Sequence, residues 1–359
     1  MPSRANVIAL PAPTVERQVF RIVSIGGGTG LSTVLSGLKR YARAVHGQLP
    51  DSLYEADITA IVTVSDDGGS SGRLRRDLDI LPPGDIRNCM VALSEDETLL
   101  SRLFQYRFHS GRGLKGHSFG NLFLAALNQV TGDFAQAVRL SSEILAIRGR
   151  IFPSTAAKVN LEARLVDGSV IAGESKISKS RQSIDRIFLR PGRCQPLKET
   201  LGAIANADVI TLGPGSLYTS IVPNLLVSGI PQAIERSRAL KLYFVNLMWQ
   251  PGETINFSAS EHVQAILKHA GGRRVMDCVV LNTAPISPAL KRKYAAQNVN
   301  PVANDFERLN ALGVKVMAAD LVGESKLVRH DPAATARIIM EMAASAGCER
   351  IQSSPKVIS

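Results

Sequence analysis

The stretch RIVSIGGGTGLSTVLSGLKRY, residues 21–41, decides the fold of this chain. Its apolar start predicts a buried strand, its glycines predict a tight turn, and an apolar pattern of helical period follows. Each glycine costs backbone entropy on folding, so the cluster indicates that something approaches the main chain closely. Unpaired amides and the helix dipole favour an anion at such a turn. The stretch therefore predicts a phosphate or nucleotide site.

The candidate ligand-binding residues of this turn are Gly26, Gly27, Gly28, Thr29 and Gly30. The turn lacks the lysine of the P-loop pattern, and Leu31 stands where GxGxxG requires another glycine. It therefore predicts neither a P-loop nucleotide hydrolase nor an ordinary NAD site. A plain strand–helix turn, with Thr29 as a helix cap, is the alternative interpretation.

Further strand-like runs recur along the chain, at residues 58–64, 208–213, 242–247, 277–282 and 314–322. Their nearly unbroken Val/Ile-rich hydrophobicity is typical of strands covered on both faces of a parallel sheet. Patterns of helical period separate most of them, at residues 31–42, 96–107, 118–130, 133–146, 217–227, 260–270, 303–312 and 332–345. The alternation predicts a doubly wound α/β fold with right-handed crossovers.

The middle of the chain departs from this alternation. AKVNLEARLVDGSVIAGESKI, residues 157–177, consists of two alternating runs around Asp167 and Gly168, which is a hairpin signal. Residues 184–189 are a candidate third strand. We therefore predict a small antiparallel insertion over about residues 157–190.

Length and composition fit a soluble globular protein of one or two domains, since the 359 residues are 45% hydrophobic and 20% charged. We predict one domain at residues 19–346, between a disordered tail at 1–18 and a C-terminal tail at 347–359. No run approaches the roughly 18 apolar residues of a membrane span. Four widely separated cysteines, without metal-ligand spacing, predict reduced thiols and a cytoplasmic location.

The net charge of +11 raises the question of a nucleic-acid partner. The basic residues are dispersed, however, and they accompany no recognisable nucleic-acid motif or pattern of stacking aromatics. The densest basic stretch, residues 176–193, alternates as the outer face of a strand would. We therefore expect no nucleic-acid partner. A solvated face explains the charge, and a small phosphate-bearing ligand is the second explanation.

A second glycine loop, GPGSLYTS at residues 213–220, repeats the order of strand, Gly-x-Gly and helix. Its candidate ligand-binding residues are Gly213, Gly215 and Ser216. Loops at the carboxyl ends of strands line one crevice in an open α/β sheet. Two such loops would hold a diphosphate between them, although a plain turn remains an alternative for this loop alone.

Two acidic candidates, Asp66 and Asp67, open the polar stretch VSDDGGSSGRLRRDLDILPPGDIRN, residues 64–88. Carboxylates at the end of a second strand commonly accept hydrogen bonds from ribose or hold Mg²⁺ through water. We expect a flexible glycine–serine loop at residues 68–72 and a rigid turn at 82–88. A long surface loop with a capping aspartate is the alternative.

GLKGHSFGN, residues 113–121, places His117, Ser118 and Asn121 at the start of a helix. Asn121 is kept as a ligand-binding candidate. His117 is a candidate acid or base, a phosphate donor or only a neighbour of the helix. No GxSxG signature accompanies it. No catalytic residue and no metal ligand is assigned.

Together with VTGD at 130–133 and QPGET at 250–254, these motifs resemble the gluconeogenesis factor (YvcK-like) family of the CofD-like, 2-phospho-L-lactate transferase superfamily. The resemblance spans about residues 19–330. It implies a Rossmann-like three-layer α/β/α fold and a cytoplasmic bacterial protein that binds UDP-sugars such as UDP-N-acetylglucosamine. Such a regulatory factor supports cell shape and peptidoglycan synthesis on gluconeogenic carbon sources, with no reaction implied.

The other branch of the superfamily implies the alternative function. Its members transfer a phospholactyl group from a guanylyl donor to a deazaflavin alcohol with Mg²⁺. A Mg²⁺-dependent transferase is therefore the second hypothesis, and Mg²⁺ is the one cofactor considered. Cell-wall synthesis proteins and a second copy of the chain are the protein partners considered.

The segments KRKYAAQNVNPV, 291–302, and KLVRHDP, 326–332, also match the family, and the resemblance puts Tyr294 and Arg329 at the nucleotide-sugar site. A tyrosine can stack on uracil or bond to ribose, and an arginine can form bidentate bonds to phosphate. An ordinary surface tyrosine and arginine are the alternatives. Trp249 stands where family members usually carry threonine, which leaves the sugar preference open.

Overall fold

The computed structural model describes residues 17–42, 53–95, 99–323 and 326–353. Its main sheet has seven strands in the order β10-β9-β8-β7-β1-β2-β3, and all neighbouring pairs are parallel. The strands are β1 (Gln18–Gly26), β2 (Tyr54–Val62), β3 (Arg150–Pro153), β7 (Val209–Leu212), β8 (Leu240–Phe244), β9 (Cys278–Asn282) and β10 (Lys315–Ala319). The predicted doubly wound α/β fold is confirmed.

The strand order reverses between β1 and β7. From β1 the chain proceeds outward to β2 and β3, and from β7 it proceeds outward in the other direction to β10. The carboxyl ends of β1 and β7 therefore flank a topological switch point, which is where open α/β sheets bind ligands. The two glycine loops follow these two strands.

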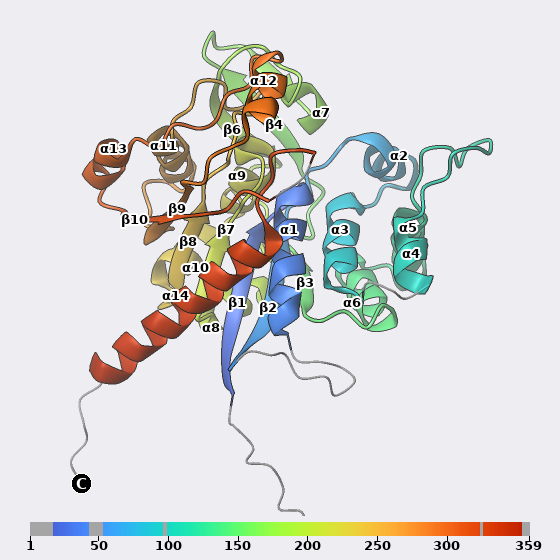
Figure 1. Ribbon diagram of the computed structural model, residues 1–359. Coiled ribbons are helices and arrows are strands. Elements are labelled where there is room, and N and C mark those ends of the chain that lie inside the picture. Colours follow the sequence, from blue (N-terminus) through green and yellow to red (C-terminus); the bar gives the residue numbers. More distant parts are fainter. Residues whose placement is uncertain (1–16, 43–52, 96–98, 324–325, 354–359) are drawn as a thin grey trace, which may run out of the picture.

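Helices cover both faces of this sheet, which gives the three layers visible in Figure 1. Helices α1 and α14 lie in front of the sheet, and α8 and α10 lie behind it. The helices named below are α1 (Gly28–Leu38), α2 (Gly69–Leu78), α3 (Gly84–Leu93), α4 (Leu99–Gln105), α5 (Phe119–Thr131), α6 (Phe134–Ile144), α7 (Glu174–Ile177), α8 (Lys198–Asn206), α9 (Val222–Leu225), α10 (Ile230–Arg236), α11 (Ala259–His269), α12 (Pro288–Ala295), α13 (Phe306–Ala311) and α14 (Pro332–Ser353).

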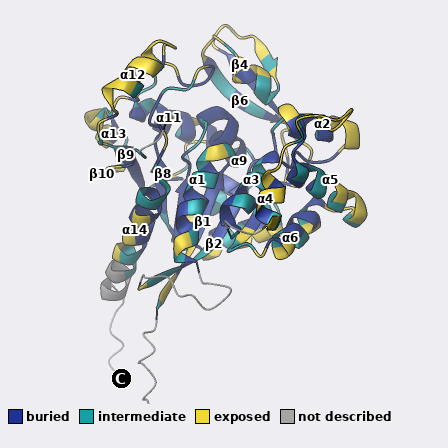
Figure 2. Cartoon of the chain, turned by 45° about the vertical axis from the view of Figure 1, so that its right-hand side comes forward, coloured by how far each residue is buried: buried dark blue, intermediate teal, exposed yellow. Residues whose placement is uncertain are grey.

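The strands at the switch point are buried on both faces. Ile22 of β1 is fully buried, and Val23 and Ile25, which point to the opposite face, are also buried. Helices on both sides exclude water from such strands, which explains their unbroken hydrophobicity. Figure 2 shows this buried sheet between partly exposed helices.

The antiparallel insertion is confirmed, but it does not extend the main sheet. Strands β4 (Asn160–Leu165), β5 (Val170–Ala172) and β6 (Ile184–Arg190) form a separate three-stranded sheet in the order β5-β4-β6. The hairpin turn at Asp167 and Gly168 joins β4 to β5, and Gly168 has a φ of 86°. The candidate third strand is β6.

Several elements differ from the sequence-based expectation. The stretch expected as a flexible loop at 68–72 begins α2, and the stretch expected as a rigid turn at 82–88 begins α3. The first turn of α2 can form because Gly72 has no side chain, since a Cβ there would collide with the carbonyl of Asp67. Tertiary packing thus overrides the low helix propensity of glycine and serine.

The chain ends also bear on the expected tails. Residues 1–16 of the predicted N-terminal tail lie outside the described residues, and β1 begins at Gln18. Helix α14 continues to Ser353, so part of the predicted C-terminal tail is helical. The start of the helix expected at 96–107 falls on residues 96–98, which are not described. Within the described residues, no helix is long and apolar enough to cross a membrane.

Candidate functional site

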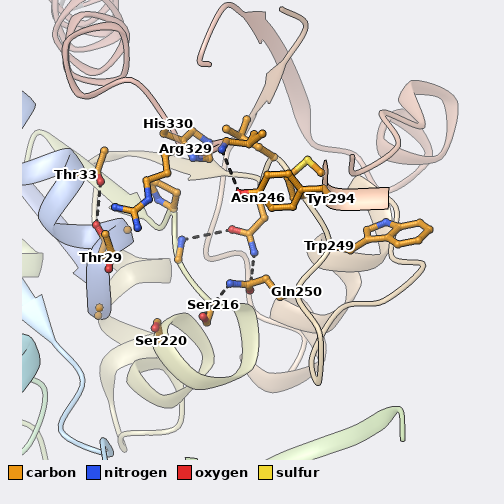
Figure 3. A pocket seen from close by; sticks show the side chains of 18 residues that line it. Thr29, Thr33, Ser216, Ser220, Asn246, Trp249, Gln250, Tyr294, Arg329 and His330 are labelled. Carbon is orange, nitrogen blue, oxygen red and sulfur yellow. Dashed lines mark hydrogen bonds between the residues drawn. The ribbon is translucent and has the colours of Figure 1, made fainter. Parts of the chain in front are cut away.

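A cavity of about 350 Å³ lies at the carboxyl ends of β1 and β7, and we call it the switch-point pocket. Both glycine loops line it, together with the segment after β8, one residue of α12 and the segment before α14 (Figure 3). Its lining residues are Gly27, Gly28, Thr29, Gly30, Thr33, Pro214, Gly215, Ser216, Ser220, Asn246, Leu247, Met248, Trp249, Gln250, Tyr294, Val328, Arg329 and His330.

The first glycine loop begins α1 with exposed main chain. Gly27 is the extended N-cap of α1, and Gly28 has a φ of 59°, a conformation that favours glycine. A Cβ on Gly30 would collide with the carbonyl of Pro214, so the two glycine loops touch through their main chains. Glycine is therefore required here because one loop approaches the other closely, whether or not a ligand also approaches the main chain.

The second glycine loop is held by a chain of side-chain amides. The Gly215 amide donates to Asn246 Oδ1 at 3.5 Å, and Asn246 Nδ2 donates to Gln250 Oε1 at 3.0 Å. Gln250 Nε2 in turn donates to Ser216 Oγ at 3.0 Å, as Figure 3 shows. Because Ser216 Oγ accepts this bond, its own hydrogen remains available to a ligand. The relay fixes Ser216 as a donor at the wall of the pocket.

Tyr294 and Arg329 approach the pocket from outside the sheet. Tyr294 is half-buried on α12, and its Oη accepts a hydrogen bond from the amide of Val328 at 3.2 Å. The Arg329 side chain is exposed and extends toward Thr29 of α1 (Figure 3). It makes no hydrogen bond or ion pair with another residue in the part of the chain that the structure describes. The guanidinium therefore faces the first glycine loop with its donors available.

Trp249 and His330 complete the wall. The Trp249 indole donates to the carbonyl of Phe257 at 3.0 Å, and in Figure 3 it lies on the side away from Thr29. Its ring is thus held at one end of the pocket. His330 is buried, and that burial lowers its pKa to about 4, so the imidazole is neutral at pH 7.

The structure does not bring all predicted site residues to this pocket. Gly26 and Gly213 belong to the two loops but do not line the cavity, and neither do Asp66, Asp67 or Asn121. Asp66 accepts a bond from the Gly68 amide and Asp67 from the Ser175 amide, both at 2.8 Å. These carboxylates follow β2, as expected, but they accept bonds from amides at the start of α2 and in α7 and do not line the pocket.

Asn121 belongs to a buried polar network instead. Its Nδ2 donates to Ser70 Oγ at 3.1 Å, and Ser70 Oγ lies 2.9 Å from Nδ1 of His117. Burial, and to a lesser extent Arg73, lowers the pKa of His117. All three side chains are at least nine-tenths buried. The network joins the first turns of α2 and α5, and it provides packing where the sequence suggested a ligand site.

A group of carboxyls next to the first glycine loop was missed by sequence reasoning. Burial raises the pKa of Asp85 to about 7, and Asp66 adds to this, while a hydrogen bond from the Gly28 amide opposes it. Burial, Asp66 and Asp85 raise the pKa of Glu174 to about 9. Asp85 lies in the stretch expected as a rigid turn at 82–88, where no carboxyl was singled out, and no pattern in the sequence indicated Glu174, which the insertion brings in on α7.

These carboxyls do not form a protein-built metal site. No three His, Cys, Asp or Glu side chains among the described residues converge in a way that could hold a metal ion. Mg²⁺ in proteins is often held by only one or two carboxylates, together with ligand phosphates and water. Cys89, Cys194 and Cys278 are buried and unpaired.

The chain is similar to known proteins over most of its length. The family model described as 2-phospho-L-lactate transferase CofD matches residues 22–322. The gluconeogenesis factor of Halalkalibacterium halodurans is 47% identical over 321 residues, which cover 89% of this chain and 95% of that protein. The gluconeogenesis factor of Bacillus subtilis is 46% identical over 323 residues, which cover 90% of this chain and 98% of that protein.

Solved structures agree with the fold. A crystal structure of a member of the UPF0052 family from Bacillus halodurans matches with a TM-score of 0.84 at 47% identity, over 90% of this chain and 99% of that one. The likeness extends over nearly the whole described chain.

Proposed function

Because this chain belongs to the CofD family and, within it, to the gluconeogenesis factors, we propose that its switch-point pocket binds a UDP-sugar. UDP-N-acetylglucosamine is the ligand of first choice. In this proposal the bound protein acts as a regulatory factor that supports cell shape and cell-wall synthesis during gluconeogenic growth.

The convergence of two glycine loops with Arg329 is the observation that carries the proposal. Glycine amides at the start of α1 and the hydroxyl of Ser216 would donate to the two phosphates. The Arg329 guanidinium would add charge-assisted bonds from the opposite wall. Pockets for small ligands measure about 300–1,000 Å³, and the cavity of about 350 Å³ falls in this range.

Tyr294 would supply the contact to the nucleoside. Its hydroxyl accepts a bond from the Val328 amide, which orients the side chain, and we propose that the ring provides the contact with the ligand. A planar base can stack on a tyrosine ring. The regulatory role, as distinct from binding, is supported by likeness to the gluconeogenesis factors alone.

The second candidate is a Mg²⁺-dependent phospholactyl transferase. The description of the family model favours it, and so do the carboxyls beside Gly28, because a cation held by phosphates would be attracted to Asp66 and Asp85. Mg²⁺ is proposed only in this sense, as a companion of ligand phosphates.

A thermal-shift panel tests the two candidates against each other. We expect UDP-N-acetylglucosamine to stabilise the full chain by about 2.7 kcal/mol at 100 times its Kd, and GDP, NAD and ATP to have little effect. Each ligand is measured with and without Mg²⁺. A shift with GDP and Mg²⁺, and none with UDP-sugars, would overturn the proposal in favour of the transferase.

Site assignment is tested by substitution. Arg329→Ala should weaken UDP-sugar binding about tenfold or more, since bonds to charged groups contribute about 1.5–3 kcal/mol. Arg308→Ala, at an exposed position of α13, is the matched control and should have no effect. In a strain that lacks the protein, only the control variant should restore normal shape under gluconeogenic growth.

A further inference from the structure

Ser220 adds a hydroxyl group to the switch-point pocket, besides that of Ser216. It lies in the helical turn η2 (Leu217–Ile221), four residues after Ser216. Only 7% of the residue is exposed, and its hydroxyl makes no hydrogen bond with any residue that the structure describes. Buried hydroxyls in folded proteins almost always have a hydrogen-bond partner. Because Ser220 lines the cavity, a ligand there can supply the partner that the described residues do not.

The Ser220 side chain stands where the two glycine loops meet. A Cβ on Gly28 would lie 3.6 Å from Ser220 Oγ, and Cβ atoms on Gly27 and Gly215 would lie 3.5 Å and 3.4 Å from Ser220 Cβ. A side chain at any of these glycines would therefore fill the space beside Ser220. In the view of Figure 3, Ser220 lies at the bottom of the pocket and Arg329 lies above it. We call the part of the pocket formed by Gly27, Gly28, Gly215 and Ser220 its floor.

The first turn of α1 supplies main-chain donors beside this floor. The first amides of a helix have no carbonyl partner within the helix. The Gly28 amide donates to Asp85, so the amides of Thr29 and Gly30 are those that remain for a ligand. Both residues line the cavity, and the helix dipole favours an anion at this end of α1. One hydroxyl and two amides thus lie together as donors, which suits a phosphate group.

The carboxyls next to the first glycine loop, Asp66, Asp85 and Glu174, would repel a phosphate if all three were ionised. Burial raises the pKa of each of them, to about 7 for Asp85 and to about 9 for Glu174. Glu174 is therefore neutral at pH 7, and Asp85 is partly neutral. Arg329 adds positive charge from the opposite wall. The charge around the floor is thus compatible with a bound phosphate.

The opposite wall is suited to the nucleoside of a ligand. Tyr294 and Arg329 belong to neighbouring segments, because the Tyr294 hydroxyl accepts a bond from the amide of Val328, the residue before Arg329. A base against the Tyr294 ring would place the adjoining phosphate near Arg329. The floor would then receive the next phosphate along the ligand.

We propose that Ser220 and the first turn of α1 bind the second phosphate of the ligand, so that the pocket selects nucleoside diphosphate derivatives over nucleoside monophosphates. In this arrangement the Ser220 hydroxyl donates to the second phosphate, and Arg329 donates to the phosphate next to the nucleoside. The order of these contacts rests on the proposed function, whereas the floor itself requires only a diphosphate group.

Isothermal titration of the full chain with UDP-N-acetylglucosamine, uridine monophosphate and inorganic pyrophosphate tests the proposal. We expect UDP-N-acetylglucosamine to bind at least tenfold more tightly than uridine monophosphate. Ser220→Ala should weaken UDP-N-acetylglucosamine and pyrophosphate about tenfold or more, because a hydrogen bond to a charged group is lost. The same variant should change the Kd of uridine monophosphate less than twofold. Ser345→Ala, at an exposed position of α14, is the matched control and should change none of the three.

Melting of the protein without ligand separates binding from a structural role. The Ser220 hydroxyl has no partner among the described residues, so Ser220→Ala should melt at the same temperature as the unaltered protein or higher. A lower melting temperature together with equal losses for all three ligands would show a structural role and overturn the proposal.

The titrations can also overturn it directly. Unchanged affinity of Ser220→Ala for UDP-N-acetylglucosamine and pyrophosphate would do so, and a loss for uridine monophosphate as large as that for UDP-N-acetylglucosamine would place the nucleoside phosphate at the floor. If UDP-N-acetylglucosamine does not bind the unaltered protein, the proposed function fails, and the pyrophosphate series still decides whether the floor binds a diphosphate. Binding of neither would overturn the floor as a phosphate site.

Discussion

At the scale of single residues, the contacts of Tyr294 suggest different roles for its ring and its hydroxyl. The hydroxyl accepts from Val328, whereas the ring lines the pocket. Tyr294→Phe should therefore change the Kd for a UDP-sugar only a few-fold, and Tyr294→Ala should weaken binding tenfold or more through loss of stacking. Isothermal titration measures both. Equal losses in the two variants would show that the hydroxyl, not the ring, is what the ligand needs.

Asp85 makes stability depend on pH. Its pKa rises from an ordinary 3.8 to about 7, so the folded state prefers the protonated form. The unfolded chain releases the proton first, and the unaltered protein therefore loses stability as pH rises from about 4 to about 7. Asp85→Asn lacks this loss. The melting temperature of the variant minus that of the unaltered protein should therefore increase as pH rises from about 4 to about 7, and it should stay constant above pH 7.

Calorimetric melts over that pH range measure the difference. Asp77→Asn, at an exposed position of α2, is the control for the same change of side chain at the protein surface. A constant difference for Asp85→Asn would mean that this carboxyl ionises normally in the folded protein.

The sequence correctly predicted those pocket residues that contribute through their main-chain position. Gly27, Gly28, Gly30, Gly215 and Ser216 all line the pocket, because a glycine turn after a buried strand fixes where its own amides lie. Tyr294 and Arg329 also line it, and there the resemblance to a family carried the inference. Side chains of Asp66, Asp67 and Asn121 escaped prediction, since their direction depends on contacts with α2 and α7.

At the scale of elements, the contact between the two glycine loops can be tested directly. A Cβ on Gly30 meets the carbonyl of Pro214, so Gly30→Ala should destabilise the protein by about 1–3 kcal/mol and weaken ligand binding. Gly202→Ala in α8 is the control, because nothing lies within 4 Å of its Cβ. That control should be neutral or stabilising by up to about 1 kcal/mol.

Chemical denaturation and ligand titration measure these two effects. Equal stability of the two alanine variants would mean that the loops separate at little cost. In that case the close contact would not define the pocket.

At the scale of elements, the periodic hydrophobic pattern predicted the long helices and strands, but it did not predict short or glycine-rich ones. Strand β3 has four residues and includes arginine and proline, which give no strand signal. Helices α2 and α3 begin in glycine, serine and proline, which usually indicate loops. Packing at the crevice, rather than local preference, makes them helical.

At the scale of the whole molecule, part of the basic charge at the insertion is paired with carboxylates, which is one reason to expect no nucleic-acid partner despite the net charge of +11. Arg164 and Lys268 both bind Asp185, and Arg190 binds Glu162. We expect a short fluorescent duplex to bind no more tightly than the non-specific range of about 10⁻⁴–10⁻⁶ M, with a steep dependence on salt. Anisotropy titration measures this, and tight binding that resists salt would contradict the expectation.

The order of the seven strands follows from the alternation of strands and helices only in part. Alternation predicts a parallel sheet and right-handed crossovers, but the reversal between β1 and β7 depends on which face each connection takes. The two glycine loops lie at the point where the reversal occurs, whereas their similarity in the sequence predicted only that both line one crevice.

Helix α1 is in close main-chain contact at two places. Gly30 faces the carbonyl of Pro214, and Gly37 faces the carbonyl of Pro332, just beyond Arg329 and His330. The helix thus works as a spacer that sets the distance between opposite walls of the pocket. Because this width depends on backbone contacts, substitutions at Ser216 or Trp249 can alter which ligand is preferred while the dimensions stay constant. If the pocket binds the proposed nucleotide sugar, single substitutions at these two positions are therefore expected to change ligand choice while the fold is kept.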